Sequence, residues 1–194
     1  MMTTGRALLL IFALLLPPGI VAVAERSQRY PRRFAEVVPG KVFRGGFPTA
    51  RHVRNLAEDK GLKTILSLTG SKPEPKYVEE TETAKAVGVR LVRIAMPGDG
   101  CGDFEDLDRA ADAIGNRANW PLFFHCDAGK QRSNAALAAY RLRKCGWTIE
   151  QVLAELQTGH GLDQRAEKNL VDHLRRYAAL AVRPSQPSKP GRGG

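Results

Sequence analysis

The feature that most constrains this chain is a nine-residue run, His125-Cys126-Asp127-Ala128-Gly129-Lys130-Gln131-Arg132-Ser133. Five residues separate the cysteine from the arginine, with a glycine at their centre. Such a segment can curl so that successive amide N–H groups point inward and form a nest for an anion. Arg132 adds a planar fork of donors suited to two phosphate oxygens at once. The run therefore predicts a phosphate-binding loop with a cysteine sulfur beneath the phosphorus.

The residues on either side of the run predict a strand, a turn and a helix. Residues 121–125 are typical of a short buried strand, and residues 133–142 are good helix formers. The positive end of the helix dipole favours both a bound phosphate and a thiolate. Cysteines in such settings titrate at about 3.5 to 7.5. We expect Cys126 to be ionised at neutral pH and to attack phosphorus directly, through a phosphocysteine intermediate and without a metal or other cofactor.

The run resembles the signature of the cysteine-based protein tyrosine phosphatase superfamily, in particular its atypical dual-specificity branch of bacterial and fungal type. Residues 42–49 and 61–68 resemble the first two strands of that domain, and the resemblance spans about residues 34–182. It implies that His125 holds the cysteine backbone and lowers the thiol pKa, and that the Ser133 hydroxyl bonds the leaving thiolate. Many relatives carry Thr-Gly where this chain has Ser133-Asn134. The residues expected to bind the phosphate are Asp127, Ala128, Gly129, Lys130, Gln131 and Arg132.

The chemistry also requires a proton donor for the departing alcohol, and a carboxylic acid on a loop beside the phosphate site is the usual solution. Asp99 lies in the predicted loop 96–102, where relatives generally place this acid. It also reads as an Asp-Gly turn residue. Asp103 competes for the role, although its position just before Phe104 is typical of a helix N-cap. The third possibility is that the loop holds no dedicated acid.

The length of 194 residues fits one catalytic domain, predicted at 34–182. Arg6, an apolar run at 7–16 and small residues at 22–24 predict a signal peptide over 1–24. The alternative is an uncleaved anchor, but the apolar run is shorter than the roughly 20 residues that a spanning helix needs. A linker at 25–33 and a disordered tail at 183–194 complete the organisation. We expect an exported protein, periplasmic or secreted, without stable membrane insertion after cleavage.

Strands and helices alternate along the rest of the chain. Strands are predicted near 42–44, 64–68, 90–94 and 121–125, with helices at 49–60, 77–87 and 104–117 and two more after residue 147. Thr148 and Gln151 are spaced as a capping box. This alternation predicts an α/β fold of the dual-specificity phosphatase type, with a central, mostly parallel sheet flanked by helices. The phosphate loop then lies at the carboxyl end of a strand.

The formal net charge of +10 suits an anionic substrate but does not identify it. Arg26, Arg29, Arg32 and Arg33 are scattered, and their simplest role is surface solvation. No aromatic residues are interleaved with the basic ones as in single-strand binding platforms, so nucleic acid is not an expected partner.

The chain has three cysteines, which leaves one unpaired in an exported protein. Cys145 ends the predicted helix, roughly 18 Å from Cys126, which excludes a disulfide between them. Cys101 lies in the acid loop, and we hypothesise that it pairs reversibly with Cys126 on oxidation. The alternative is a small loop residue, and intact-mass analysis of oxidised protein decides between them. Beyond the adjacent His125 and Cys126, no cysteine or histidine pair stands at zinc-ligand spacing.

We therefore predict a phosphatase that hydrolyses phosphomonoesters, with a phosphorylated protein or a small aryl phosphate as substrate. One alternative is an inositol-phosphate or phosphoinositide phosphatase, in which Lys130 would reach a second phosphate, although the Asp127 carboxylate would repel it. Another is a module that binds phosphate groups without turnover. Arsenate reduction or sulfur transfer on a similar loop would need a cysteine relay, and none is evident.

Overall fold

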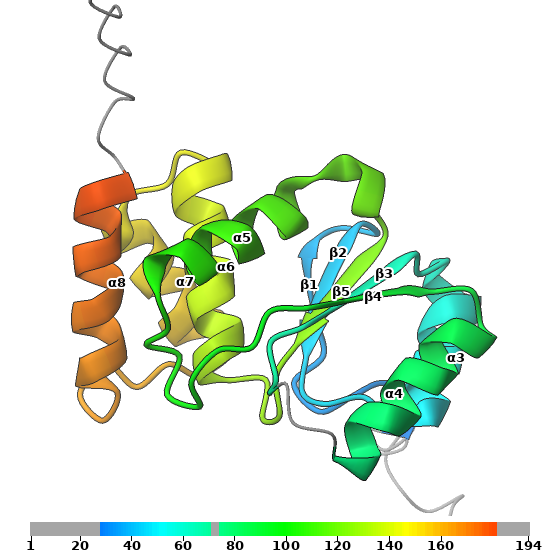
Figure 1. The fold of residues 1–194 in the computed structure, drawn as a ribbon. Helices are drawn as coiled ribbons and strands as arrows, with labels where there is room; N and C mark the ends of the chain where they lie inside the picture. Colours follow the sequence, from blue (N-terminus) through cyan, green and yellow to red (C-terminus); the bar gives the residue numbers. More distant parts are fainter. Residues whose placement is uncertain (1–27, 71–73, 182–194) are drawn as a thin grey trace, which may run out of the picture.

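The computed structural model describes residues 28–70 and 74–181 (Figure 1). The predicted signal peptide at 1–24, the start of the predicted linker and the predicted tail at 183–194 lie outside the described residues. Residues 28–33, which the sequence assigns to the linker, pack on the domain. Tyr30, for example, stacks on Phe34 with ring centroids 4.5 Å apart, and Arg29 bonds Asp59.

A five-stranded sheet forms the centre of the fold, in the order β1-β2-β5-β3-β4. Strand β1 runs antiparallel to β2, and the other neighbours are parallel, which confirms the predicted mostly parallel sheet. The strands are β1 (Ala35–Val38), β2 (Val42–Gly45), β3 (Thr64–Ser67), β4 (Arg90–Arg93) and β5 (Leu122–His125). The short β1 was not predicted. Because β5 lies in the middle, the segment that follows it emerges between the ends of β2 and β3.

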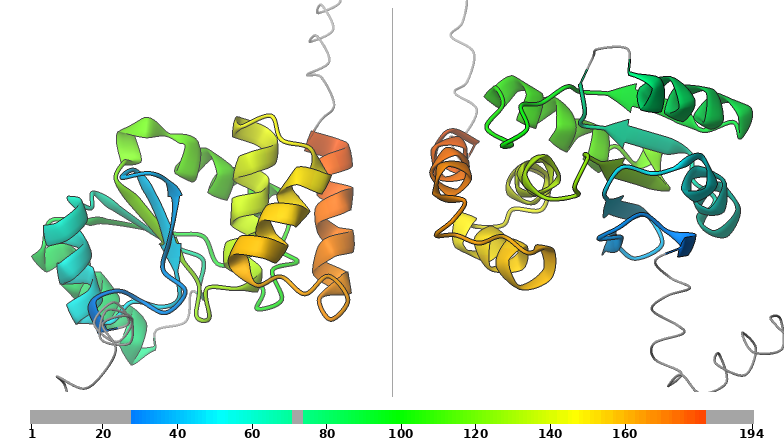
Figure 2. Two further views of the ribbon diagram at one scale, coloured as in Figure 1. Left: turned by 180° about the vertical axis from the view of Figure 1, so that it is seen from behind. Right: turned by 90° about the horizontal axis from the view of Figure 1, so that it is seen from below.

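Helices cover both faces of the sheet, as predicted (Figures 1 and 2). One face carries α3 (Ala50–Lys60) and α4 (Pro75–Ala86), and the other carries α5 (Phe104–Gly115) and α6 (Gln131–Lys144). Further out, α7 (Ile149–His160) and α8 (Lys168–Ala181) pack against α6. Successive strand residues point to opposite faces and fill two separate cores: Phe43, Ile65 and Phe123 face α3 and α4, whereas Val42, Leu66 and Phe124 face α5 and α6.

The helix ends follow local sequence signals. Gly61, in the left-handed region with φ 60°, ends α3. The predicted capping box is confirmed: the Thr148 hydroxyl accepts from the Gln151 N–H, and the Gln151 side chain accepts from the Thr148 N–H. The predicted helix at 104–117 ends earlier, at Gly115, and a short 3₁₀ turn, η1 (Arg117–Asn119), leads into β5. No helix within residues 28–70 and 74–181 is long and apolar enough to cross a membrane.

Candidate active site

The nine-residue run forms the connection from β5 to α6, at the carboxyl end of the central strand. His125 ends β5, and Gln131 begins α6, two residues earlier than predicted. Neighbouring segments hold the loop, since the Leu68 N–H donates to the His125 carbonyl at 2.8 Å and the Phe47 N–H donates to the Asp127 carbonyl at 3.0 Å. All the predicted site residues except Asp99 therefore come from a single strand-loop-helix unit.

Gly129 is required by two features of the loop. Its φ is +69°, a conformation that L side chains rarely adopt, and a Cβ there would lie 2.7 Å from both the carbonyl carbon of Gly45 and the nitrogen of Gly46. The loop thus rests directly on the backbone after β2. This contact explains the paired glycines in the 42–49 stretch, because a Cβ on Gly46 would in turn lie 3.1 Å from the Asp127 carbonyl oxygen.

Cys126 is buried at the floor of the loop, with 2% of its surface exposed. Its Sγ accepts hydrogen bonds from the Gly129 N–H at 3.2 Å and from the Ser133 hydroxyl at 3.3 Å. Burial raises the pKa of the thiol, but hydrogen bonds from Ser133 and the Lys130 backbone, together with the Arg132 charge, outweigh burial and lower it. The structure thus favours a thiolate at this position.

His125 lies behind the loop, and its side chain and that of Glu80 are fully buried. Its Nδ1 is 3.4 Å from the Cys126 carbonyl oxygen. Its Nε2 lies 2.6 Å from Oε1 of Glu80 on α4. The second Glu80 oxygen accepts from Arg93 on β4 at 3.0 Å. Nothing in the sequence distinguishes Glu80 from the other glutamates of α4, so its contact with His125 could not be predicted.

Arg132 is held by the carboxylate of Asp127, with Nη2 and Oδ2 2.6 Å apart, and also donates to the Leu68 carbonyl at 3.3 Å. The other Asp127 oxygen accepts from Lys76 at 3.0 Å. Burial raises the pKa of Asp127, but the bonds from Arg132 and Lys76 outweigh it and lower the pKa. Asp127 is thus ionised and paired, and an incoming phosphate would have to replace it on the Arg132 fork.

Lys130 does not face a free second-phosphate position, because its ammonium pairs with Glu167 at 3.1 Å. Its role in the loop is instead carried by its backbone N–H, one of the donors that lower the Cys126 pKa. Gln131 contributes through its carbonyl, which contacts the loop around Gly100.

Three arginines bond the outward-facing carbonyls of the loop, one each. Arg32 Nη2 donates to Asp127 O at 2.8 Å, Arg33 Nη1 to Ala128 O at 2.9 Å and Arg44 Nη2 to Gly129 O at 3.1 Å. The same Arg44 nitrogen reaches the side-chain oxygen of Asn134 at 2.8 Å, which gives the residue that departs from the relatives a structural role. Arg32 and Arg33 therefore do more than solvate a surface, which their scattered positions in the sequence did not reveal.

The loop that holds the predicted acid lies against the start of α6. Gly100, with φ +81°, approaches Gln131 so closely that a Cβ would come within 2.8 Å of the Gln131 carbonyl oxygen. The exposed Asp99 accepts from the Cys101 N–H at 3.0 Å, so its side chain forms an Asx turn. Asp103 occupies the predicted N-cap position of α5, but its side chain makes no cap hydrogen bond. Neither carboxylate is hydrogen-bonded to Cys126 or Arg132 in the described part of the chain.

The three cysteines are all free. Cys101 is partly buried in the acid loop, and burial, followed by the Asp99 charge, raises the pKa of its thiol. Cys145 lies at the C-terminal end of α6, far along the helix from Cys126, as predicted. The disulfide between Cys101 and Cys126 remains a prediction.

Comparison with known proteins finds a matching family model and curated relatives. A family model described as "DSP-PTPase phosphatase fused to NAD+ kinase" matches residues 22–173. The inositol diphosphatase Siw14 of Saccharomyces cerevisiae is 29% identical over 130 residues, which cover 64% of this chain and 44% of that protein. The inositol diphosphatase DSP1 of Oryza sativa subsp. japonica is 30% identical over 132 residues, which cover 66% of this chain and 56% of that protein. The chain spans about half the length of these curated relatives.

The fold is also similar to a solved structure, the core catalytic domain of the PP-IP phosphatase Siw14 from S. cerevisiae in complex with citrate. The TM-score is 0.60 at 24% sequence identity, and the match covers 78% of this chain and 93% of that one. This likeness supports the α/β architecture.

Proposed function

Because the chain belongs to the family of DSP-PTPase phosphatases fused to NAD+ kinase, and so to the atypical dual-specificity branch of the cysteine-based protein tyrosine phosphatases, we propose that it hydrolyses phosphomonoesters through a phosphocysteine on Cys126. The observation that carries this proposal is the sulfur itself. It is buried at the floor of an anion-binding loop, with the Gly129 N–H and the Ser133 hydroxyl directed at it.

Each step of the reaction has a candidate group in this site. The Cys126 thiolate attacks phosphorus, and a P–S bond forms as the bond to the leaving oxygen breaks. The loop amides and the Arg132 fork stabilise the equatorial phosphoryl oxygens, after Asp127 has released Arg132. Water then attacks phosphorus, and the sulfur leaves as a thiolate that Ser133 and Gly129 stabilise by hydrogen bonds.

The proton donor for the leaving oxygen is proposed to be Asp99, with Asp103 as the competitor. The loop that carries both rests on α6 beside the phosphate loop, and opening the Asx turn would free the Asp99 carboxylate. Asp127 is closer to Arg132, but its lowered pKa makes it a poor acid. In Asp99→Asn we expect kcat to fall by about 10²-fold for substrates with poor leaving groups. The variant that removes the basic limb of the pH–rate profile identifies the acid.

Two substrate classes have specific support. The burial of the Cys126 sulfur at the floor of the loop suits a phosphotyrosyl or other aryl phosphate, whose phosphate is carried at the end of a long group. The names of the relatives favour a second candidate, an inositol diphosphate. The objection that Asp127 would repel a polyanion is weakened, because Lys76 and Arg132 both pair with that carboxylate.

The substrate is tested by comparing kcat/KM for an aryl phosphate, a phosphotyrosyl peptide and a diphosphoinositol polyphosphate, with reduced protein and chelator present. The control is Cys126→Ser. A preference of tenfold or more for the inositol substrate would assign the second candidate, and the reverse would assign the first. Vanadate binding without turnover on any of them would contradict the proposed hydrolase and indicate a phosphate-binding module.

We also propose that the protein is exported, on the sequence of residues 1–24 alone. N-terminal sequencing of protein recovered from the secreted or periplasmic fraction should find a chain that begins near residue 25. Recovery of uncleaved chain from the cytosol alone would contradict export.

A further inference from the structure

The peptide unit that joins Ala128 to Gly129 is hydrogen-bonded at both ends. Its carbonyl oxygen accepts from Arg33 Nη1 at 2.9 Å, and its N–H, that of Gly129, donates to the Cys126 sulfur at 3.2 Å. Hydrogen bonds in such a chain polarise one another, and the effect is larger inside a protein than in water. A cation on the carbonyl therefore strengthens the N–H as a donor to a thiolate.

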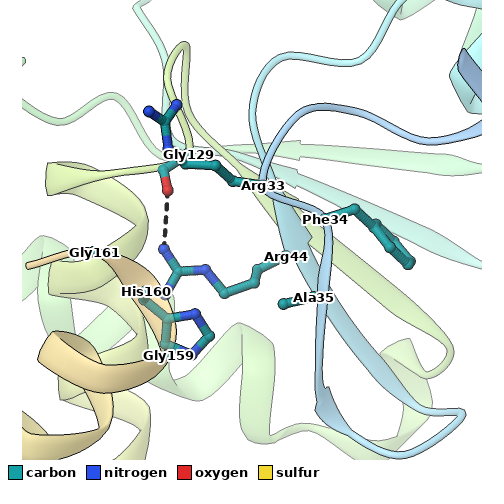
Figure 3. A pocket seen from close by; sticks show the side chains of 8 residues that line it. All are labelled: Arg33, Phe34, Ala35, Arg44, Gly129, Gly159, His160 and Gly161. Atoms are coloured by element: carbon teal, nitrogen blue, oxygen red, sulfur yellow. Dashed lines mark hydrogen bonds between the residues drawn. The ribbon is translucent and has the colours of Figure 1, made fainter. Parts of the chain in front are cut away.

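The next peptide unit repeats this arrangement. The Gly129 carbonyl accepts from Arg44 Nη2 at 3.1 Å, a contact that Figure 3 shows from the side of the adjoining cavity of about 220 Å³. The N–H of the same unit belongs to Lys130, whose backbone hydrogen bond helps to lower the Cys126 pKa. Arg44 is 1% exposed, and within residues 28–70 and 74–181 no carboxylate forms an ion pair with it. Burial lowers the pKa of Arg44 to about 10, while the charges of Cys126 and Glu155 act in the opposite direction, so the guanidinium is charged at neutral pH.

Arg33 has an unusual backbone conformation that suits this contact. With φ 54° it is the only described residue other than glycine in the left-handed region. That conformation is unfavourable for an L residue and persists where surrounding contacts impose it. Here the preceding carbonyl, of Arg32, accepts from the Gly46 N–H at 2.8 Å, and the two arginines reach consecutive loop carbonyls.

We propose that Arg33 and Arg44 are positioning residues that activate Cys126 through the backbone, by polarising the consecutive peptide units Ala128–Gly129 and Gly129–Lys130, the first of which donates its N–H to the sulfur. The proposal rests on the proposed cysteine chemistry, and it assigns a role to two residues that act on the sulfur without contacting the substrate. The other groups that act on the sulfur are Ser133 and Arg132 on α6, and its neighbours in the chain are His125 at the end of β5 and Asp127 in the loop. Glu155 on α7 acts on Arg44 from behind.

The test is the pH dependence of Cys126 alkylation by iodoacetamide, in a background with Cys101→Ser and Cys145→Ser so that a single thiol reacts. The thiolate is the reactive form. In Arg33→Ala we expect the rate on the acidic side of the profile to fall about threefold, and the plateau at high pH to stay unchanged. Arg33→Lys, which restores a charged donor, should recover part of the loss.

Two arginine variants separate this effect from a general loss of charge. Arg32→Ala removes an equal charge beside the loop. Arg32 bonds the Asp127 carbonyl, however, and the N–H of that peptide unit is not among the described donors to the Cys126 sulfur. We expect it to lower the rate by less than half as much. Arg29→Ala, whose partner is Asp59, should leave the profile unchanged. Arg44→Lys, with its fold checked by thermal denaturation, should shift the profile in the same direction as Arg33→Ala.

An Arg33→Ala profile that coincides with the unmutated protein would overturn the proposal, and so would equal effects of Arg32→Ala and Arg33→Ala. Alkylation reads the thiol directly. A protein without turnover on the substrates above would therefore leave this measurement intact, so the two proposals fail separately.

Discussion

Replacement of Gly129 by alanine is the sharpest perturbation of the phosphate loop that the structure offers. The new Cβ would lie 2.7 Å from backbone atoms of Gly45 and Gly46, neither of which is a flexible side chain that could move away. The left-handed φ adds roughly 1–2 kcal/mol, and forced backbone displacement adds about 1–3 kcal/mol. If about 3 kcal/mol of this cost falls on the loop conformation that binds the transition state, kcat/KM decreases about 10²-fold.

Gly61→Ala is the matched control. Gly61 has almost the same φ, 60°, but a Cβ there meets nothing within 4 Å, and the residue lies at the end of α3. We expect it to lower Tm by about 2–6 °C through backbone strain alone, and to leave kcat/KM within about twofold. The assays are steady-state hydrolysis of an aryl phosphate, vanadate affinity and thermal denaturation for both variants. Retention of activity and vanadate affinity by Gly129→Ala would refute the claim that the loop needs this close approach.

Three further predictions follow from single contacts. Ser133→Ala removes the hydroxyl donor to the Cys126 sulfur, so kcat should fall about 10- to 100-fold. Phosphocysteine should accumulate in rapid-quench experiments, and an unchanged kcat would contradict this role of Ser133. Glu80→Gln removes the buried carboxylate that pairs with Arg93 and contacts His125, and it should lower the urea-derived free energy of unfolding by about 3 kcal/mol. Glu79→Gln, at the exposed neighbour, should lower it by less than about 0.5 kcal/mol, and equal effects of the two variants would contradict the role of Glu80. Burial, followed by the Arg44 charge, lowers the pKa of His160 from 6.5 to about 4, so the unfolded chain binds the proton first and the free energy of unfolding decreases as the pH drops from 6.5 to 4. Over this pH range His160→Leu should lose about 1 kcal/mol less of that free energy than the unmutated protein. Identical pH–stability curves for the two proteins would contradict this role of His160.

Much of the fold follows from local sequence patterns. The alternation of strands and helices predicts the parallel sheet, and Gly61 and the Thr148–Gln151 pair mark helix ends that the structure confirms. The sequence does not predict strand β1, because four residues are too few to show a periodic pattern. Its antiparallel pairing with β2 depends on tertiary contacts rather than on local sequence.

The phosphate loop is visible in the sequence because its chemistry is local, with nucleophile, amides and arginine in one run. Its supports are not local. Arg33 and Arg44 precede Gly129 by 96 and 85 positions. Arg44 reaches the loop because β2 pairs with β5, and Arg33 reaches it because the segment before β1 is hydrogen-bonded to Gly46 through the Arg32 carbonyl. Glu80 on α4 likewise lies far from His125 in the sequence and contacts it only in the folded structure. The Asp127 carboxylate was expected to repel substrate phosphates, whereas the structure shows it paired with Arg132 and Lys76.

The most direct test of the account is to trap the covalent intermediate. The reduced, metal-free protein is quenched with acid during turnover of an aryl phosphate, and the peptide that contains Cys126 is examined by mass spectrometry. The account predicts one added phosphoryl group on the Cys126 sulfur, absent from Cys126→Ser, which also releases no phosphate. Turnover without this adduct, or turnover that persists in Cys126→Ser, would contradict the assignment of Cys126 as the nucleophile.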